Sequence, residues 1–259
     1  MNIIQSILTK NPCYKAGRKI TVKGLMLHSV GCAQPSAKVF VKLWGSGNYE
    51  IGVHGIIDGN TGDVYQCLPW NHRGWHGGGS ANNTHIGVEM CEPACIKYTS
   101  GANFTCSDLP TAKAVAQRTY DTAVQLFAHL CELYKLDPLG DGVIVSHKEG
   151  HKRGIASNHG DPEHLWKQLG MGYTMDTFRK AVKNAMGTTT TVEKAAFNVG
   201  DKVKMSNDAT VYGKTTKFAS FVYKSTLYVR QIDGDRIVIS TLKTGAVTGA
   251  VDKKYLTKM

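Results

Sequence analysis

The stretch 146–166, SHKEGHKRGIASNHGDPEHLW, gathers side chains that can bind a metal ion. It contains four histidines and an Asp-Pro turn, and it directly follows the apolar run Val143–Val145. This order predicts that His147 lies at the tip of a buried strand and that an irregular, glycine-containing loop follows it. Imidazole nitrogens and carboxylate oxygens are good zinc ligands, and a catalytic zinc takes three protein ligands, which leaves the fourth position for water.

This loop can supply two ligands, so the third must come from elsewhere in the chain. His28 is the best candidate because it ends another apolar run, 24–27. A histidine-rich loop can also be a solvated surface, and for any single histidine that is the better interpretation. Two strand-end histidines combined with a histidine/aspartate pair favour the metal site. An HExxH zinc motif is not favoured, because Glu149 sits two places after His147 and Gly150 disfavours a continuous helix.

Glu89 is a second candidate for chemistry, because it interrupts the apolar segment 85–90, HIGVEM. A carboxylate in such a strand must face a partner or a site, since burying it unpaired is costly. A salt-bridged or end-exposed glutamate is the alternative. The functional interpretation is a general base that takes a proton from water activated by the metal.

The composition is that of an ordinary globular protein. The chain has 259 residues, of which 42% are hydrophobic, and no apolar run of 18 residues or more, so we expect no membrane span. The N-terminal apolar patch is short and is broken by Gln5 and Ser6, so we expect synthesis in the cytoplasm without a signal peptide. The seven cysteines are an odd number, and in a chain without an export signal we expect free, mostly buried thiols.

The basic charge is concentrated towards the C-terminus. The formal net charge is +11, and the 72 residues from Thr188 onward contribute +6 of it, with 12 Lys and Arg against 6 Asp and Glu. Such an excess is typical of proteins that bind polyanions, either nucleic acid or the anionic polymers of a bacterial wall, although it also serves solubility. A nucleic-acid partner is disfavoured, because the sequence has no reading helix and no RNP-type aromatic motif.

Alternating strand and helix patterns in the first part of the chain predict an α/β domain. Residues 1–20 are expected to form an irregular arm, and a hairpin is expected around the Asp-Gly-Asn and Thr-Gly turn at 58–62. The expected strands are 20–27, 52–57, 64–68, 85–90 and 143–145, and the expected helices are 37–43, 109–134 and 175–186.

The last part of the chain has a different character. Residues 188–195 are a threonine-rich candidate linker between a domain at 1–187 and a second domain at 196–259. Short β-prone segments separated by turn residues and without a helical pattern predict a small β-barrel. These segments are 202–205, 210–212, 226–232, 236–241 and 250–256.

Five motifs together resemble the zinc-dependent N-acetylmuramoyl-L-alanine amidases. More narrowly, residues 1–185 are similar to the type 2 amidases of phage and prophage endolysins, which share the peptidoglycan-recognition-protein fold, and the tail resembles SH3-like wall-binding domains. The motifs, in chain order, are LMLHS at 25–29, GVHGIIDG at 52–59, RGWHGGG at 73–79, HIGVEMCE at 85–92 and the histidine-rich stretch at 146–166.

The resemblance implies a mixed central sheet flanked by helices, with a zinc ion held by three side chains. Residue by residue, these ligands are His28, His147 and Asp161, and Glu89 matches the family's catalytic glutamate. His159 stands where the family often has a lysine that polarises the scissile carbonyl, and an imidazole can also stabilise an oxyanion.

Three further residues, His54, Trp75 and His76, lie in motifs that the resemblance implies contact the substrate. Trp75 can alternatively be a core residue. One departure is Val53, where some relatives carry a tyrosine near the zinc. His151 and His164 are expected to be structural or solvated.

The implied function is hydrolysis of the amide bond between N-acetylmuramic acid and the L-alanine of the stem peptide. The implied partners are peptidoglycan and anionic wall polymers, without nucleic acid or membrane, and the enzyme would reach the wall after release through a holin-type pore. A non-catalytic peptidoglycan-binding protein of the same fold is the alternative. It is less favoured, because all three ligand positions hold metal-competent residues.

Overall fold

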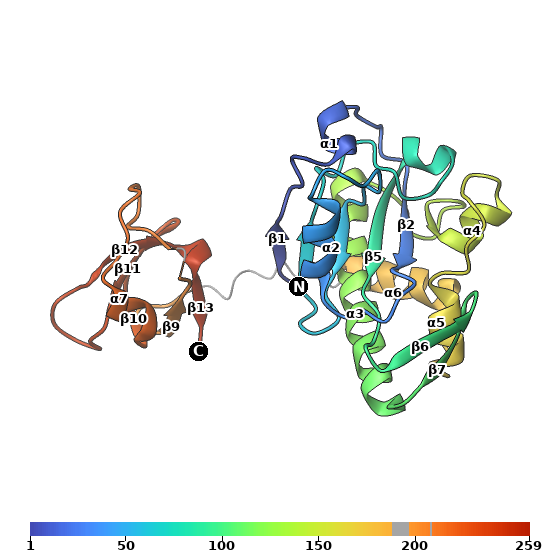
Figure 1. Cartoon of the computed structure of the whole chain (residues 1–259). Coiled ribbons are helices and arrows are strands. Elements are labelled where there is room, and N and C mark those ends of the chain that lie inside the picture. Colours follow the sequence, from blue (N-terminus) through green and yellow to red (C-terminus); the bar gives the residue numbers. More distant parts are fainter. Residues whose placement is uncertain (188–196, 208) are drawn as a thin grey trace. The chain divides into compact units, whose positions relative to one another are not determined.

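The computed structural model describes residues 1–187, 197–207 and 209–259, and it divides the chain into two compact units (Figure 1). One unit precedes residues 188–196 and the other follows them, and each unit is described by itself. The predicted linker, 188–195, lies outside the described residues.

The N-terminal unit is built on a six-stranded mixed sheet. The resemblance implied a mixed central sheet, and five of the six strands were predicted. In spatial order its strands are β1 (Ile3–Gln5), β4 (Val64–Gln66), β3 (Gly55–Ile57), β5 (His85–Met90), β2 (Gly24–Ser29) and β8 (Ile144–Ser146). β3 and β4 form the antiparallel hairpin, whereas the other neighbouring strands are parallel. Because β5, β2 and β8 run in the same direction, their carboxyl ends meet at one edge of the sheet.

Helices lie on both faces of this sheet (Figure 1). The longest, α3, follows the predicted N-cap Asp108, whose side chain accepts a hydrogen bond from the Thr111 N–H. A hairpin of β6 (Ile96–Ser100) and β7 (Asn103–Cys106), which the sequence analysis did not predict, lies beside α5. The helices are α1 (Pro12–Ala16), α2 (Ala37–Trp44), η1 (Ser80–Asn83), α3 (Leu109–Tyr134), α4 (His147–Lys152), α5 (Glu163–Gln168) and α6 (Met175–Gly187).

The alternation of side chains along the strands decides which residues face the core. Leu25 and Leu27 of β2 pack in the cluster that α3 and α6 cover, whereas Met26 belongs to a different cluster on the other face. Successive residues of a strand point to opposite faces, so His28 lies on the same face as Met26. The same alternation in β5 places Glu89 on that face, directly opposite His28 in the strand register.

Two local predictions were wrong, the second only in part. Residues 1–20 do not form an irregular arm, because β1 adds to the edge of the sheet beside β4 and α1 begins at Pro12. The segment after His147 is irregular only from residue 153 to residue 162, because the helix α4 occupies residues 147–152. A capping box between Ser146 and Glu149 satisfies the backbone groups at its first turn and outweighs the low helix propensity of Gly150.

The C-terminal unit has a core of its own around a five-stranded antiparallel sheet. Most of the predicted segments appear as strands, but 210–212 makes only isolated bridges, and a short helix, α7, was not predicted. The sheet order is β12-β11-β10-β9-β13, with β9 at Lys202–Met205, β10 at Leu227–Asp233, β11 at Arg236–Ser240, β12 at Gly249–Asp252 and β13 at Leu256–Lys258, together with α7 at Ser220–Lys224 and η2 at Lys253–Tyr255.

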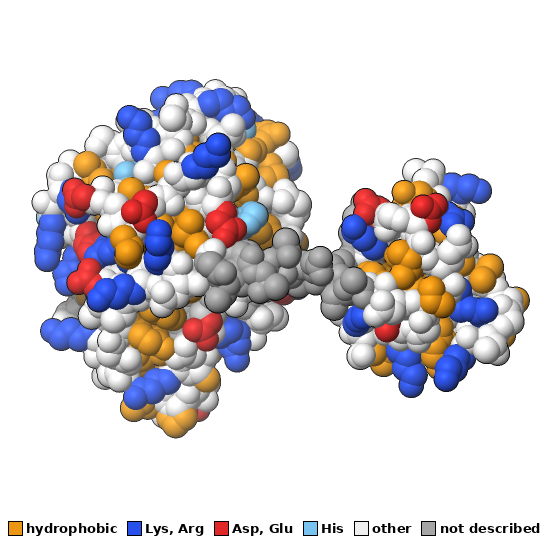
Figure 2. Space-filling view, turned by 180° about the vertical axis from the view of Figure 1, so that it is seen from behind, with side chains coloured by type: hydrophobic (Ala, Val, Ile, Leu, Met, Phe, Trp, Pro, Cys, Tyr) orange, Lys and Arg blue, Asp and Glu red, His pale blue; other side chains and the backbone are white. Residues whose placement is uncertain are grey.

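One face of the molecule shows how its basic side chains are distributed. Lys and Arg side chains are spread over both units on the face shown in Figure 2, rather than gathered in one patch. Within the described residues, none of the helices is long and apolar enough to cross a membrane.

Candidate active site

Three side chains with metal-ligand chemistry converge at the carboxyl ends of β2 and β8. His28, His147 and Asp161 each present one ligand atom, and these atoms lie within 4.8 Å of one another. The two Nδ1 atoms are 3.0 Å apart, and His28 Nδ1 is 3.3 Å from an Asp161 carboxylate oxygen. His28 lies in β2, His147 opens α4, and Asp161 precedes α5, so three elements distant in the sequence build one cluster.

The outer nitrogen of each imidazole has its own partner, which fixes the ring. His28 Nε2 is 3.0 Å from His76 Nδ1, and His147 Nε2 is 3.1 Å from the Ser157 hydroxyl. The two ligand rings are nearly perpendicular, at 86°. Both Nδ1 atoms therefore point into the space shared with Asp161, and metal-binding histidines are usually held in this way.

The electrostatics of the cluster favour one positive charge at its centre. Burial alone would lower the pKa of His28, but the contact with Asp161 raises it on balance. Burial and the neighbouring His28 lower the pKa of His147 to about 4. Burial would raise the pKa of Asp161, but the hydrogen bond and charge of His28 lower it overall. The opposite pKa shifts of His28 and Asp161 show that the cluster favours a positive charge beside the carboxylate, and the donor set of two imidazoles and a carboxylate suits zinc.

Glu89 lies on β5 beside this cluster. Its Oε2 atom is buried without a hydrogen-bond partner, and its side chain lines the same cavity as the three ligands. Burial raises the pKa of Glu89 to about 7, with His28 opposing this shift and Asp161 and Glu92 adding to it. A carboxylate with a pKa near neutrality suits a general base, because it both accepts and returns a proton at physiological pH.

An open cavity of about 630 Å³ joins these groups. The predicted residues His159, Trp75 and His76 line it together with the ligands and Glu89. His159 is exposed, and its Nδ1 lies 3.3 Å from His147 Nδ1. Trp75 is 43% exposed, with the Arg73 guanidinium 5.3 Å from the ring centre, so this tryptophan is a wall of the cavity rather than a core residue.

The structure places His54 away from this cavity. It is fully buried, its Nε2 donates to the His72 carbonyl and its Nδ1 accepts from the Gly87 N–H. This position does not support the predicted contact with substrate. Gly87 has a specific reason to be glycine, because a Cβ there would lie 2.3 Å from the His76 ring. The His76 ring therefore packs closely against Gly87 of β5, and its Nδ1 contacts His28 Nε2.

The lining of the cavity also contains a polar group that the sequence analysis missed. The Tyr98 hydroxyl lies 2.6 Å from both the Glu92 carboxylate and His164 Nε2, and Tyr98 and His164 line the cavity. Tyr98 comes from the β6–β7 hairpin. Its alternation with polar neighbours in IKYTS was the available signal, but nothing in the sequence shows that the hairpin lies over this site.

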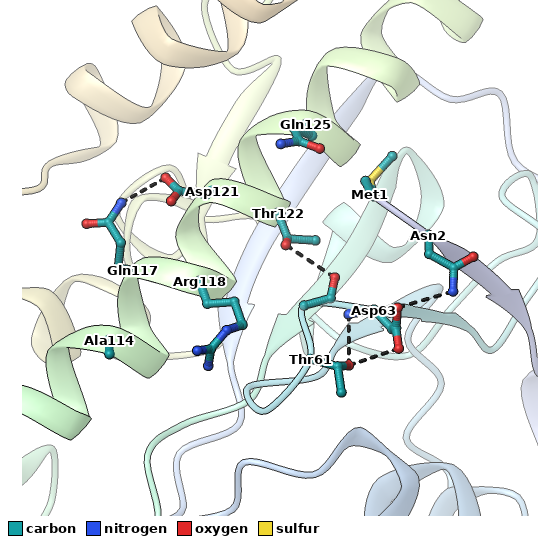
Figure 3. A pocket seen from close by; sticks show the side chains of 11 residues that line it. Met1, Asn2, Thr61, Asp63, Ala114, Gln117, Arg118, Asp121, Thr122 and Gln125 are labelled. Atoms are coloured by element: carbon teal, nitrogen blue, oxygen red, sulfur yellow. Dashed lines mark hydrogen bonds between the residues drawn. The ribbon is translucent and has the colours of Figure 1, made fainter. Parts of the chain in front are cut away.

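A second recess of about 640 Å³ lies beside α3, β1 and the β3–β4 turn (Figure 3). Several of its polar groups pair with one another: Asp63 accepts hydrogen bonds from Asn2 and Thr61, and Asp121 accepts one from Gln117. It contains no histidine or cysteine. We therefore assign the chemistry to the cavity that holds the histidine/aspartate cluster.

Solved structures with a similar fold were found. The Staphylococcus aureus hydrolase AmiA, solved with its ligand, is similar over 72% of this chain and 83% of its own, with 17% identity and a TM-score of 0.54. The PlyG catalytic domain is similar over 74% of this chain and 99% of its own, with 18% identity and a TM-score of 0.50. At these identities the likeness shows the fold. None of the curated proteins searched matches this chain.

Fold and site together define an α/β domain with a candidate metal centre at the carboxyl edge of its sheet. The chain belongs to the N-acetylmuramoyl-L-alanine amidase family, whose sequence model matches residues 18–164, more than half of the chain. It is therefore a peptidoglycan hydrolase of this specificity, as the sequence predicted.

Proposed function

We propose that the chain is a zinc-dependent amidase, in which His28, His147 and Asp161 hold the metal. The observation that supports this proposal best is the convergence of the three ligand atoms within 4.8 Å at the floor of an open cavity. When bound, zinc would supply Lewis acidity that polarises the scissile carbonyl and acidifies the attacking water.

In this proposal Glu89 is the general base and then the general acid of the reaction. Its partnerless Oε2 takes a proton from the attacking water and delivers it to the nitrogen of L-alanine as that amine leaves. His159 lies at the rim, close to His147, where an imidazole N–H can donate to the oxyanion of the tetrahedral intermediate. Trp75 offers an exposed ring face to a sugar or peptide group. His76 instead holds His28 in place.

We further propose that the C-terminal unit is an SH3-like anchor and that the whole protein is an endolysin. Two of its aromatic side chains, Tyr212 and Phe221, are exposed and free to stack on sugars or peptides. Phe218 and Tyr223 pack against the core instead. Under this proposal the anchor binds anionic wall polymers and adds no chemistry, because residues 197–259 include no histidine or cysteine. Release through a separate holin-type pore would bring the enzyme to the wall.

The catalytic proposal is tested by Glu89→Gln, which keeps the shape of the side chain but removes the base. We expect this variant to bind zinc as the wild type does and to lose activity on purified walls by about 10²–10⁴-fold. Mass spectrometry of the wild-type products should show peptides that begin with L-alanine and glycans with a free lactyl carboxyl group.

The matched control is Glu132→Gln, because Glu132 is an exposed glutamate on α3, a helix that packs on the other face of the sheet. It should be as active as the wild type. Full lysis of walls by Glu89→Gln would exclude Glu89 as the base.

A further inference from the structure

A chain of polar contacts connects α6 to α4, which begins at His147, and to α5, which follows Asp161. It starts at Ser146, the N-cap of α4, which directly precedes His147. The Ser146 hydroxyl accepts the Glu149 N–H at 3.0 Å, and the Glu149 carboxylate accepts the Ser146 N–H at 3.2 Å. The same hydroxyl donates to the Glu163 carboxylate at 3.0 Å. Glu163 opens α5, two residues after the candidate ligand Asp161.

Arg179 of α6 is the last member of this network and donates to the Glu149 carboxylate. Its two terminal nitrogens bind both oxygens of the Glu149 carboxylate, at 2.9 and 3.1 Å, and one of them also donates to the Ile144 carbonyl of β8 at 3.0 Å. The arginine and glutamate side chains are only 18% and 26% exposed. A bidentate, partly buried pair of this kind fixes geometry more firmly than a surface ion pair.

We propose that Arg179 is a positioning residue for the metal centre, acting through Glu149 and Ser146 on His147. This inference rests on the proposed zinc site. Arg179 locks the carboxylate that caps the first turn of α4, so it sets where His147 Nδ1 lies relative to His28 and Asp161. Loss of a group that hydrogen-bonds a metal ligand directly typically weakens metal affinity by about 10–100-fold. Arg179 acts through Glu149 and Ser146 instead, so we expect an effect at the lower end of that range.

This inference also extends the catalytic unit beyond the segment that matches the family. The match ends at residue 164, and Arg179 lies 15 residues further along the chain. Docking of α6 does not depend on Arg179 alone, because Met175, Phe178 and Val182 are buried in the main core. A substitution at Arg179 should therefore leave the helix in place and change the network.

The test is the zinc affinity of the full chain carrying Arg179→Met, measured by competition with a chromogenic chelator. The control is Arg153→Met, because Arg153 follows α4 and pairs with Asp141. These two side chains are 41% and 87% exposed, and they are not part of the capping box of Ser146 and Glu149. We expect zinc binding to weaken about 10-fold or more in Arg179→Met and to stay within about twofold of the wild type in Arg153→Met. The visible spectrum of the cobalt-loaded protein should change in Arg179→Met alone.

Equal affinity in these two variants would overturn the inference while leaving the zinc site intact. If the wild type itself bound no zinc, the proposed function would fail and this inference with it. Should Arg179→Met not fold, Arg179→Lys serves instead, since it keeps the charge but not the two-nitrogen contact. It should weaken zinc binding by a smaller factor, and an affinity equal to that of Arg153→Met would overturn the inference.

Discussion

The buried environment of the Glu89 carboxyl group suits proton transfer, but it lowers the stability of the folded state when the group is ionised. One of its oxygens is buried without a partner, and burial is the main reason that its pKa rises to about 7. A buried carboxyl group of this kind lowers the stability of the folded protein, and its raised pKa lets it act as a base near neutral pH. This cost gives a measurement that does not depend on activity.

Glu89 should make the metal-free protein less stable as the pH rises. Its pKa is raised in the folded state, so the protonated carboxyl is favoured by folding. Its contribution is complete below the unfolded value of 4.5 and is lost as the pH rises through about 7. Glu89→Gln has no such titration. Its melting temperature relative to the wild type should therefore increase by about 2 °C or more between pH 5 and pH 8.

The comparison between the two proteins removes the titration of groups that do not interact with Glu89. The Glu89 charge also raises the pKa of His28, so the measured difference belongs to the Glu89–His28 pair. Chelator-treated samples at several pH values, followed by calorimetry, give the difference directly. A difference that stays constant with pH would mean that Glu89 has an ordinary pKa.

At the residue scale, much of the site could be predicted from local sequence. Strand-end histidines and a glutamate inside an apolar strand are visible as exceptions to an apolar pattern, and their positions follow from strand direction. Tyr98 and Arg179 could not be found in this way. Each reaches the site region through a tertiary contact, with His164 and with Glu149 respectively.

At the scale of elements, the parallel arrangement of β5, β2 and β8 brings Glu89, His28 and His147 to the same edge of the sheet. Periodicity predicted all three strands, because each is buried and apolar, and it predicted α3, because that helix combines a capping residue with a helical repeat. The elements that were mispredicted are short. β1 is a strand only because β4 pairs with it, and α4 begins at His147 only because Ser146 and Glu149 cap it.

At the scale of the whole molecule, the two units have separate cores. Buried residues of the C-terminal unit, from Phe197 to Leu256, form a cluster distinct from those around the large sheet. We therefore expect a chain truncated after Gly187 to fold, keep its zinc and hydrolyse soluble muropeptides. It should bind and lyse whole walls less well, and the fragment 196–259 should sediment with walls without cutting them.

The salt dependence of binding measures how much of the expected attachment to walls is electrostatic. Binding of the isolated fragment should weaken as the screening length falls towards about 3 Å near 1 M salt, because charge attraction acts over a shorter range. If the truncated chain lost zinc or its activity on soluble substrate, the C-terminal unit would belong to the catalytic machinery.

The metal content of the purified protein tests the central claim most directly. Elemental analysis should find about one zinc per chain in the wild type, and much less in His147→Ala and in Asp161→Asn. Strong chelation should abolish amidase activity of the wild type, and added zinc should restore it. A wild-type protein that remained fully active on muropeptides after its metal had been removed would contradict the account.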